Sequence, residues 1–131
     1  MLKITKKVEY ALIAISYLQS ATYNKPHSVN TIAQKFRIPK EILAKAMQEL
    51  CQASLLESIK GPHGGYKLSK NPSTIRMTEF FEILEGPIGI MDCYIDANCE
   101  QIQTCNIKDP VTKVNNSLRR VFNNLTLADM A

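Results

Sequence analysis

Apolar residues recur at helical spacing along the first fifty residues of the chain. Residues 5–20 predict a first helix with Thr5 as its N-cap, and its apolar face is made by Val8, Leu12, Ile15 and Leu18. Ser28 is suited to cap a second helix, and Pro39 is suited to the first turn of a third. The buried positions expected in the second helix are Ile32, Ala33 and Phe36. Three helices are therefore predicted, with a very short turn between the second and the third.

The third predicted helix, "PKEILAKAMQELCQA", divides into two faces when its residues are placed at about 100° each. One face collects polar and small side chains: Lys40, Glu41, Ala44, Lys45 and Gln48. The opposite face is apolar and is expected to pack: Ile42, Leu43, Ala46, Met47 and Leu50. The second helix of a helix-turn-helix needs this division, because its exposed face enters the major groove of DNA. A plain amphipathic surface helix would show the same pattern.

The segment that follows favours the DNA-binding interpretation. "LLESI" and "YKLS" predict two short strands, and "KGPHGG" between them supplies the glycines and proline of a tight reversal. A basic hairpin directly after a helix-turn-helix is typical of the wing of a winged helix. We therefore expect a helix-turn-helix at about 28–51 and a wing at about 55–68. An ordinary tight turn would explain the glycines without explaining this helical context.

These faces predict specific contacts with double-stranded DNA. Lys40, Lys45 and Gln48 would face the major groove, with Glu41 as a possible acceptor of a hydrogen bond from cytosine. Contacts to phosphates or to the minor groove are expected from Lys35, Lys60, His63 and Lys67.

Two further helices are predicted after the wing. "MTEFFEILEG" forms one, with Gly86 as its stop, and the other runs from Pro110 to about Leu125. The last helix has apolar residues at alternating steps of three and four: Val111, Val114, Leu118, Val121 and Leu125. That alternation is typical of a seam between two helices and predicts a homodimer, although packing back onto the first helix is the alternative.

The predicted fold is mostly α with a small β wing: a winged helix-turn-helix domain plus a long C-terminal dimerisation helix. Residues 1–76 would form the DNA-binding domain, 77–109 a connecting helix and a cysteine-bearing loop, and 110–131 the dimerisation helix and tail. Charge agrees with this division. Residues 1–76 hold 12 Lys and Arg against 4 Asp and Glu, whereas residues 77–131 hold 4 against 8.

Composition limits the function classes. A hydrophobic content of 45% argues against disorder, and no apolar run is long enough to span a bilayer, so no membrane partner is expected. The first residues show no signal-peptide pattern, and we expect a cytoplasmic protein. An enzyme such as a thiol oxidoreductase is disfavoured, because C-x-x-C and nucleotide-binding glycine motifs are absent from the sequence. A partner-binding adaptor is disfavoured by the basic first portion.

Three cysteines stand at even spacing in "CYIDANCEQIQTC": Cys93, Cys99 and Cys105. Thiolates are soft ligands that suit iron–sulfur clusters, and a loop with five residues on each side of Cys99 can place three sulfurs around one cluster. A zinc site and a thiol switch remain alternatives, although the tight cysteine pairs common in zinc modules are absent. Cys51 is expected to pack as a small hydrophobic residue.

The sequence resembles the IscR/NsrR-like (Rrf-two) family of winged-helix iron–sulfur transcriptional regulators over almost its whole length. The resemblance rests on "KITKKVEYALIAISYL", "SVNTIAQKFRIPKEILAKAMQEL", "IKGPHGGYKLSKNP", "EILEGPI" and "LTLADM", together with the three cysteines. It implies a dimer that binds palindromic promoter DNA, and a cluster held by the three cysteines. The cluster would sense nitric oxide, oxygen, redox change or iron–sulfur status. A clusterless repressor that responds to thiol oxidation or a small metabolite is the alternative.

The fourth cluster ligand is where the sequence departs from part of that family. Some relatives place a histidine just beyond the third cysteine, whereas this chain has Lys108 there, and a protonated lysine is not a ligand. Another subtype uses a carboxylate near the start of the first helix of the partner subunit. The resemblance implies Glu9 for that role, and the alternative is a solvated Glu9 or one paired with Lys6. Weaker candidates for the fourth ligand are Glu100, Asp92, Asp96 and His27.

Overall fold

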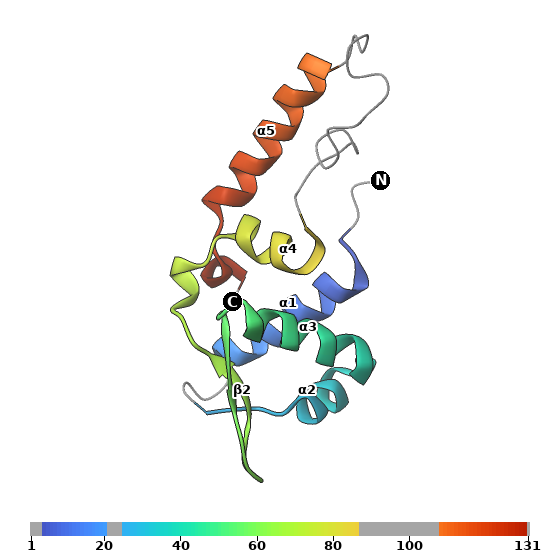
Figure 1. Cartoon of the computed structure of the whole chain (residues 1–131), viewed down its shortest axis with the longest axis vertical. Coiled ribbons are helices and arrows are strands. Elements are labelled where there is room, and N and C mark those ends of the chain that lie inside the picture. Colours follow the sequence, from blue (N-terminus) through green and yellow to red (C-terminus); the bar gives the residue numbers. More distant parts are fainter. Residues whose placement is uncertain (1–3, 21–24, 87–107, 131) are drawn as a thin grey trace.

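The computed structural model describes residues 4–20, 25–86 and 108–130 (Figure 1). The longer helices are α1 (Lys6–Ser20), α2 (Val29–Phe36), α3 (Lys40–Gln52), α4 (Met77–Glu85) and α5 (Lys108–Asn124). Two strands, β1 (Leu56–Ile59) and β2 (Gly65–Leu68), and two 3₁₀ turns, η1 (Pro72–Thr74) and η3 (Leu127–Met130), complete the described elements. The predicted mostly helical fold with a small antiparallel sheet is confirmed.

The core lies where α1, α3 and α4 meet, with α2 against α3. Its largest fully buried side chains include Ile15, Met47, Leu50 and Phe80. Helix α1 presents the apolar face expected from its spacing, and Thr5 Oγ1 accepts a hydrogen bond from the Val8 amide at 3.3 Å. Burial of these apolar faces is the dominant stabilising contribution to the fold.

The two strands form a hairpin, with Leu56 opposite Leu68 and Ile59 opposite Gly65. The hairpin is tied to the segment before α2, because His27 and Tyr66 exchange two backbone hydrogen bonds of 3.0 and 2.8 Å. Gly65 has a φ of 151°, and a Cβ there would lie 2.3 Å from the backbone carbonyl carbon of His27. Glycine is therefore required where the hairpin meets this segment.

The end of the chain returns to the core, which the sequence did not indicate. Leu127 is fully buried, and its amide donates to the Ile75 carbonyl at 3.0 Å. Gln19 Nε2 of α1 donates to the Leu127 carbonyl at 2.9 Å. Helix α5 thus extends away from the body at the end opposite the hairpin, while the turn after it is anchored beside α1 (Figure 1).

Two expectations about burial are wrong. Phe36, the last residue of α2, is 39% exposed, because its ring packs edge-on against Tyr17 and leaves its outer side uncovered. Ile42, in the first turn of α3, is 37% exposed, because it lies at the edge of the face whose buried residues are Leu43, Ala46, Met47 and Leu50. Helix α5 also begins at Lys108, two residues earlier than predicted. None of the described helices is long and apolar enough to cross a bilayer.

Candidate nucleic-acid interface

The turn between α2 and α3 fixes how α3 is presented. Ser28 Oγ caps α2 by accepting from the Thr31 amide at 3.1 Å. At the other end of α2, Arg37 adopts the left-handed conformation with φ 54°. The Ile38 amide then donates to the Ala33 carbonyl at 2.9 Å, and the Ile38 side chain is buried. Because Ile38 is anchored in the core, the short turn holds α3 at a defined angle to α2.

The inner face of α3 is anchored by burial and by one ion pair. Leu43, Ala46, Met47 and Leu50 have no exposed surface. Glu49 accepts from Lys7 Nζ of α1 at 3.0 and 3.3 Å, and both side chains are largely covered. This pair, which the sequence analysis missed, joins α3 to α1 where both helices carry charge beside the core.

The outer face of α3 carries the residues selected from the sequence. Lys40, Glu41, Lys45 and Gln48 are all exposed. No ion pair joins Lys40, Glu41 or Lys45 to any residue that the structure describes. Arg37, which is exposed in the turn before this helix, adds one basic group that sequence reasoning missed. The face therefore offers cationic and amide groups that remain available to a ligand.

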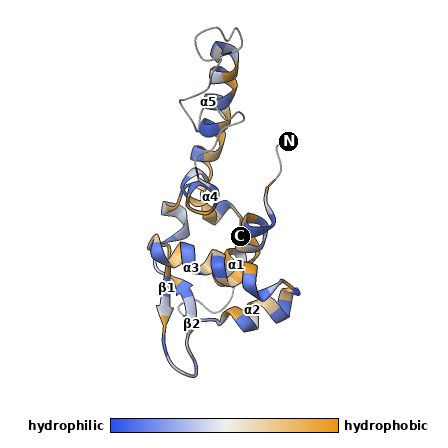
Figure 2. Ribbon diagram, turned by 45° about the vertical axis from the view of Figure 1, so that its right-hand side comes forward, coloured by the Kyte–Doolittle hydropathy of each residue, from blue (hydrophilic) through white to orange (hydrophobic). Residues whose placement is uncertain are grey.

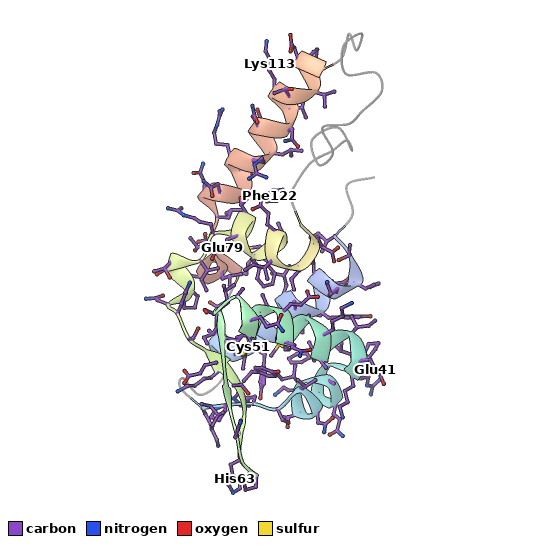
Figure 3. All side chains as sticks on the ribbon, in the orientation of Figure 1. Glu41, Cys51, His63, Glu79, Lys113 and Phe122 are labelled. Atoms are coloured by element: carbon purple, nitrogen blue, oxygen red, sulfur yellow. The ribbon has the colours of Figure 1, made fainter. Side chains whose placement is uncertain are left out.

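The hairpin extends a second basic surface beyond the body. Figure 3 shows His63 at the far end of the hairpin, and Lys60 beside it is also exposed. Lys67 differs from these two, since it lies opposite Glu57 with 3.9 Å between Nζ and Oε2. Its charge is partly balanced within the hairpin, so the tip is the more available basic surface.

Lys35 lies outside the surface formed by α3. It is exposed on the last turn of α2, and its Nζ lies 4.8 Å from the centre of the Tyr17 ring of α1. The predicted phosphate contact of Lys35 therefore depends on a side chain that rests on an aromatic ring in this structure.

Helix α5 has one face that packs on α4 and another that is exposed. On one face Phe122 packs edge-on against Phe81 of α4, with ring centres 5.2 Å apart, and Arg119 Nη1 pairs with Glu82 Oε1 at 2.6 Å. On another face Val114 and Val121 are 51% and 56% exposed. That second face holds a shallow groove of about 320 Å³ lined by Lys113, Val114, Ser117, Leu118 and Val121.

We call the apolar positions that recur at steps of three and four along α5, together with the residue directly after it, the α5 stripe: Val111, Val114, Leu118, Val121 and Leu125. Val111 and Leu118 are half-buried, and the other three are exposed. Within the described residues α5 packs on α4, and the expected alternative of packing on α1 is not among its main contacts. Three members of the stripe, Val114, Val121 and Leu125, are thus left facing solvent in a single chain.

Of the predicted cluster ligands, Glu9 alone lies within the residues that the structure describes. Cys93, Cys99 and Cys105 lie outside the described residues. Glu9 lies in the first turn of α1, is 49% exposed at its side chain, and pairs with Lys6 at 3.3 Å. Within residues 4–20, 25–86 and 108–130, no three His, Cys, Asp or Glu side chains are grouped to hold a metal ion. Cys51 packs partly buried against the core, as expected.

Known proteins match this chain over nearly its whole length. A family model described as "Rrf2: Iron-dependent Transcriptional regulator" matches residues 4–131. Among solved structures, CymR (YrzC), the global cysteine regulator of B. subtilis, is 28% identical with a TM-score of 0.78. That match covers 100% of this chain and 97% of CymR.

Two further structures give similar values. IscR of T. potens is 27% identical with a TM-score of 0.76, covering 98% of this chain and 85% of that protein. A protein from Listeria innocua is 30% identical with a TM-score of 0.79, again covering 98% of this chain and 85% of the other.

Proposed function

Because this chain belongs to the Rrf2 family of transcriptional regulators, we propose that it acts as a homodimer that binds a palindromic operator in promoter DNA. Residues 1–76 would form the DNA-binding domain, 77–109 the connecting helix and cysteine loop, and 110–131 the dimerisation helix and tail. The cytoplasm is the compartment in which such a regulator would meet its DNA.

One observation carries the DNA-binding proposal: α3 is fully anchored on one face and bears uncovered polar and basic groups on the other. Lys40, Lys45 and Gln48 are suited to the major groove, because lysine and glutamine donate to base edges and phosphates. Glu41 can accept from cytosine. The exposed wing tip, with Lys60 and His63, would reach the backbone or minor groove beside it.

The α5 stripe supports the homodimer. Val114, Val121 and Leu125 would cost free energy if left in water, and a second copy of the same stripe would cover them. The other members, Val111 and Leu118, would complete the seam. Two-fold symmetry would then place two α3 helices in successive major grooves, about 34 Å apart along the duplex.

We further propose that the dimer holds an iron–sulfur cluster on Cys93, Cys99 and Cys105, with Glu9 of the partner subunit as the fourth ligand. Three thiolates and one carboxylate are a chemically suitable donor set, and the family is described as iron-dependent. The Glu9 carboxylate is half exposed and held only by a surface ion pair with Lys6, so it is free to exchange partners. When bound, the cluster would supply reactivity towards nitric oxide, oxygen or electrons.

A second candidate is a clusterless regulator that responds through thiol oxidation or a small metabolite. The similarity to CymR, described as a global cysteine regulator, over the full length of this chain favours it. Anaerobic purification followed by an absorption spectrum and an iron and sulfide assay separates the two. Iron and sulfide in stoichiometric amounts support the cluster, whereas protein without iron after cluster reconstitution supports the clusterless candidate.

Selection from a pool of random duplexes tests DNA binding without knowledge of the operator. We expect the purified dimer to enrich a palindrome whose half-sites lie about 10 base pairs apart, centre to centre. Enrichment of no sequence by protein with or without a reconstituted cluster would refute the proposed function.

Replacement of Glu9 tests the fourth ligand. Glu9→Ala should make the reconstituted cluster decay faster in air, because one ligand position would pass to solvent. Glu79→Ala is the matched control, since Glu79 is an exposed carboxylate on α4. Equal decay of the cluster in both variants would remove Glu9 from the ligand set.

A further inference from the structure

A surface cavity of about 730 Å³ lies on the side of the DNA-binding domain formed by α1, α2 and η3. Its lining includes Ile13 and Tyr17 from α1, His27 from the segment before α2, Phe36 from α2 and Met130 from η3. Of these elements η3 lies farthest away in the sequence, and it reaches the cavity because it returns to α1, where Ser16 and Gln19 donate to its carbonyls. The α5 stripe contributes nothing to this cavity.

One wall of the cavity is aromatic. The Tyr17 ring lies 5.0 Å from His27 and 5.5 Å from Phe36, centre to centre, with Phe36 edge-on. Phe36 is 39% exposed and Met130 is 43% exposed, so large apolar surfaces at the rim are in contact with water. A ligand with a flat apolar body would remove that surface from water and pack on the rings.

The polar groups of the cavity favour a negative charge. Lys35 Nζ lies over the Tyr17 ring, and Lys35 forms no ion pair with any residue that the structure describes. His27 Nε2 is covered and has no hydrogen-bond partner among the described residues. No described lining residue is acidic. The cavity therefore combines a cation and apolar walls with no competing carboxylate among its described lining residues.

We propose that this cavity binds a small organic anion: a carboxylate or sulfonate with an aromatic or similarly flat apolar body. The acid group would lie against Lys35, and the apolar body would lie between Tyr17, Phe36 and Met130. The volume is in the range of cavities that hold ligands of this size, about 300–1,000 Å³. The site needs neither DNA nor a cluster, so its failure is distinguishable from failure of the proposed function.

The probe for the test is 8-anilinonaphthalene-1-sulfonate, an aromatic anion whose fluorescence rises on transfer from water to an apolar site. The uncharged N-phenyl-1-naphthylamine serves as the comparison probe. Lys35→Gln removes the cation and keeps a polar side chain that is one bond shorter, and Lys40→Gln is the matched control on the neighbouring helix. Both lysines are exposed, so both variants should fold, which thermal unfolding can verify.

We expect Lys35→Gln to raise the dissociation constant of the anionic probe about threefold to fivefold, the range of one partly exposed charge pair. Lys40→Gln should leave it unchanged, and the uncharged probe should bind all three proteins equally. Because the probe can also bind the α5 stripe, only the difference between the two variants is diagnostic. Equal anion affinity in both variants would overturn the proposal. So would a difference between the two variants that disappears as the chains associate, which would assign the cavity to a second copy of the chain.

Discussion

Helices α3 and α5 are both amphipathic, yet only one of them has its apolar face covered within the chain. In α3, Leu43, Met47 and Leu50 are fully buried, and the exposed face is polar. In α5, Val114 and Val121 remain more than half exposed. Figure 2 shows polar and apolar residues alternating along the whole of α5, including the part that extends beyond α4.

The difference indicates two kinds of partner. A helix whose apolar face is satisfied and whose outer face bears lysine and glutamine is complementary to a hydrated polyanion. A helix whose apolar face is exposed is complementary to another apolar face. The first therefore suits DNA, and the second suits another copy of the chain. In Figure 1, α5 extends from one end of the molecule and the hairpin tip from the other, with α3 in the body between them. The exposed face of α3 and the α5 stripe therefore lie apart.

The largest effect is expected when the buried face of α3 is truncated. Leu50→Ala should lower the free energy of unfolding by about 3 kcal/mol, because it removes buried methyl groups and leaves a cavity within the hydrophobic core. Urea denaturation followed by circular dichroism measures the change. Gln48→Ala, two residues earlier on the exposed face, should change it by no more than about 0.5 kcal/mol. Similar losses in the two variants would contradict the assignment of faces.

A charge placed on the α5 stripe should weaken the dimer next most strongly. Val121→Glu removes one apolar contact from each of two chains, a loss of about 2.7 kcal/mol, which corresponds to a dissociation constant raised about 100-fold. Sedimentation equilibrium measures it.

Asn116→Glu is the control for the stripe, because Asn116 is exposed on the far side of the same helix and the added charge is identical. It should leave the dimer nearly unchanged. Equal weakening by the two variants would mean that charge alone, rather than the apolar stripe, determines assembly.

Removal of one cation from the exposed face of α3 should have a smaller effect. Lys45→Gln should raise the dissociation constant for the selected operator about tenfold, the range of one base or phosphate contact. Fluorescence anisotropy over a series of salt concentrations separates the two kinds of contact. A phosphate contact lowers the salt slope by about one, whereas a base contact changes sequence preference. Lys113→Gln on α5 is the control, and equal losses in both variants would contradict a specific role for Lys45.

Much of the fold could be predicted because local signals agree with burial. Thr5 and Ser28 cap the helices that they were expected to cap, and Gly86 ends α4 with a positive φ. The hairpin is also local, since its glycines stand where the reversal requires them. Each of these features depends on residues close together in the sequence, which periodicity and turn chemistry can detect.

The features that escaped prediction depend on contacts between distant segments. The burial of Leu127 follows from hydrogen bonds with Ile75 and Gln19, which no local pattern reveals. The same return of the chain adds Met130 to the lining of the cavity beside Tyr17. The apolar character of Phe36 predicts a buried residue, but Phe36 is 39% exposed and its ring contacts Tyr17 of α1 edge-on. The burial of Leu127 and the exposure of Phe36 are therefore set by tertiary packing, which the hydrophobicity of each residue alone does not predict.

The smallest effect is expected at Ile42, where sequence and structure disagree about the boundary of the buried face of α3. Ile42→Ala should lower the free energy of unfolding by only about 0.5 kcal/mol, because the side chain is 37% exposed and its neighbours can relax into solvent. Leu43→Ala, one residue further along and fully buried, is the matched comparison and should cost several times more. Urea denaturation of both variants measures the difference. Equal losses would mean that Ile42 is covered in solution, and the buried face would then have the width expected from its periodicity.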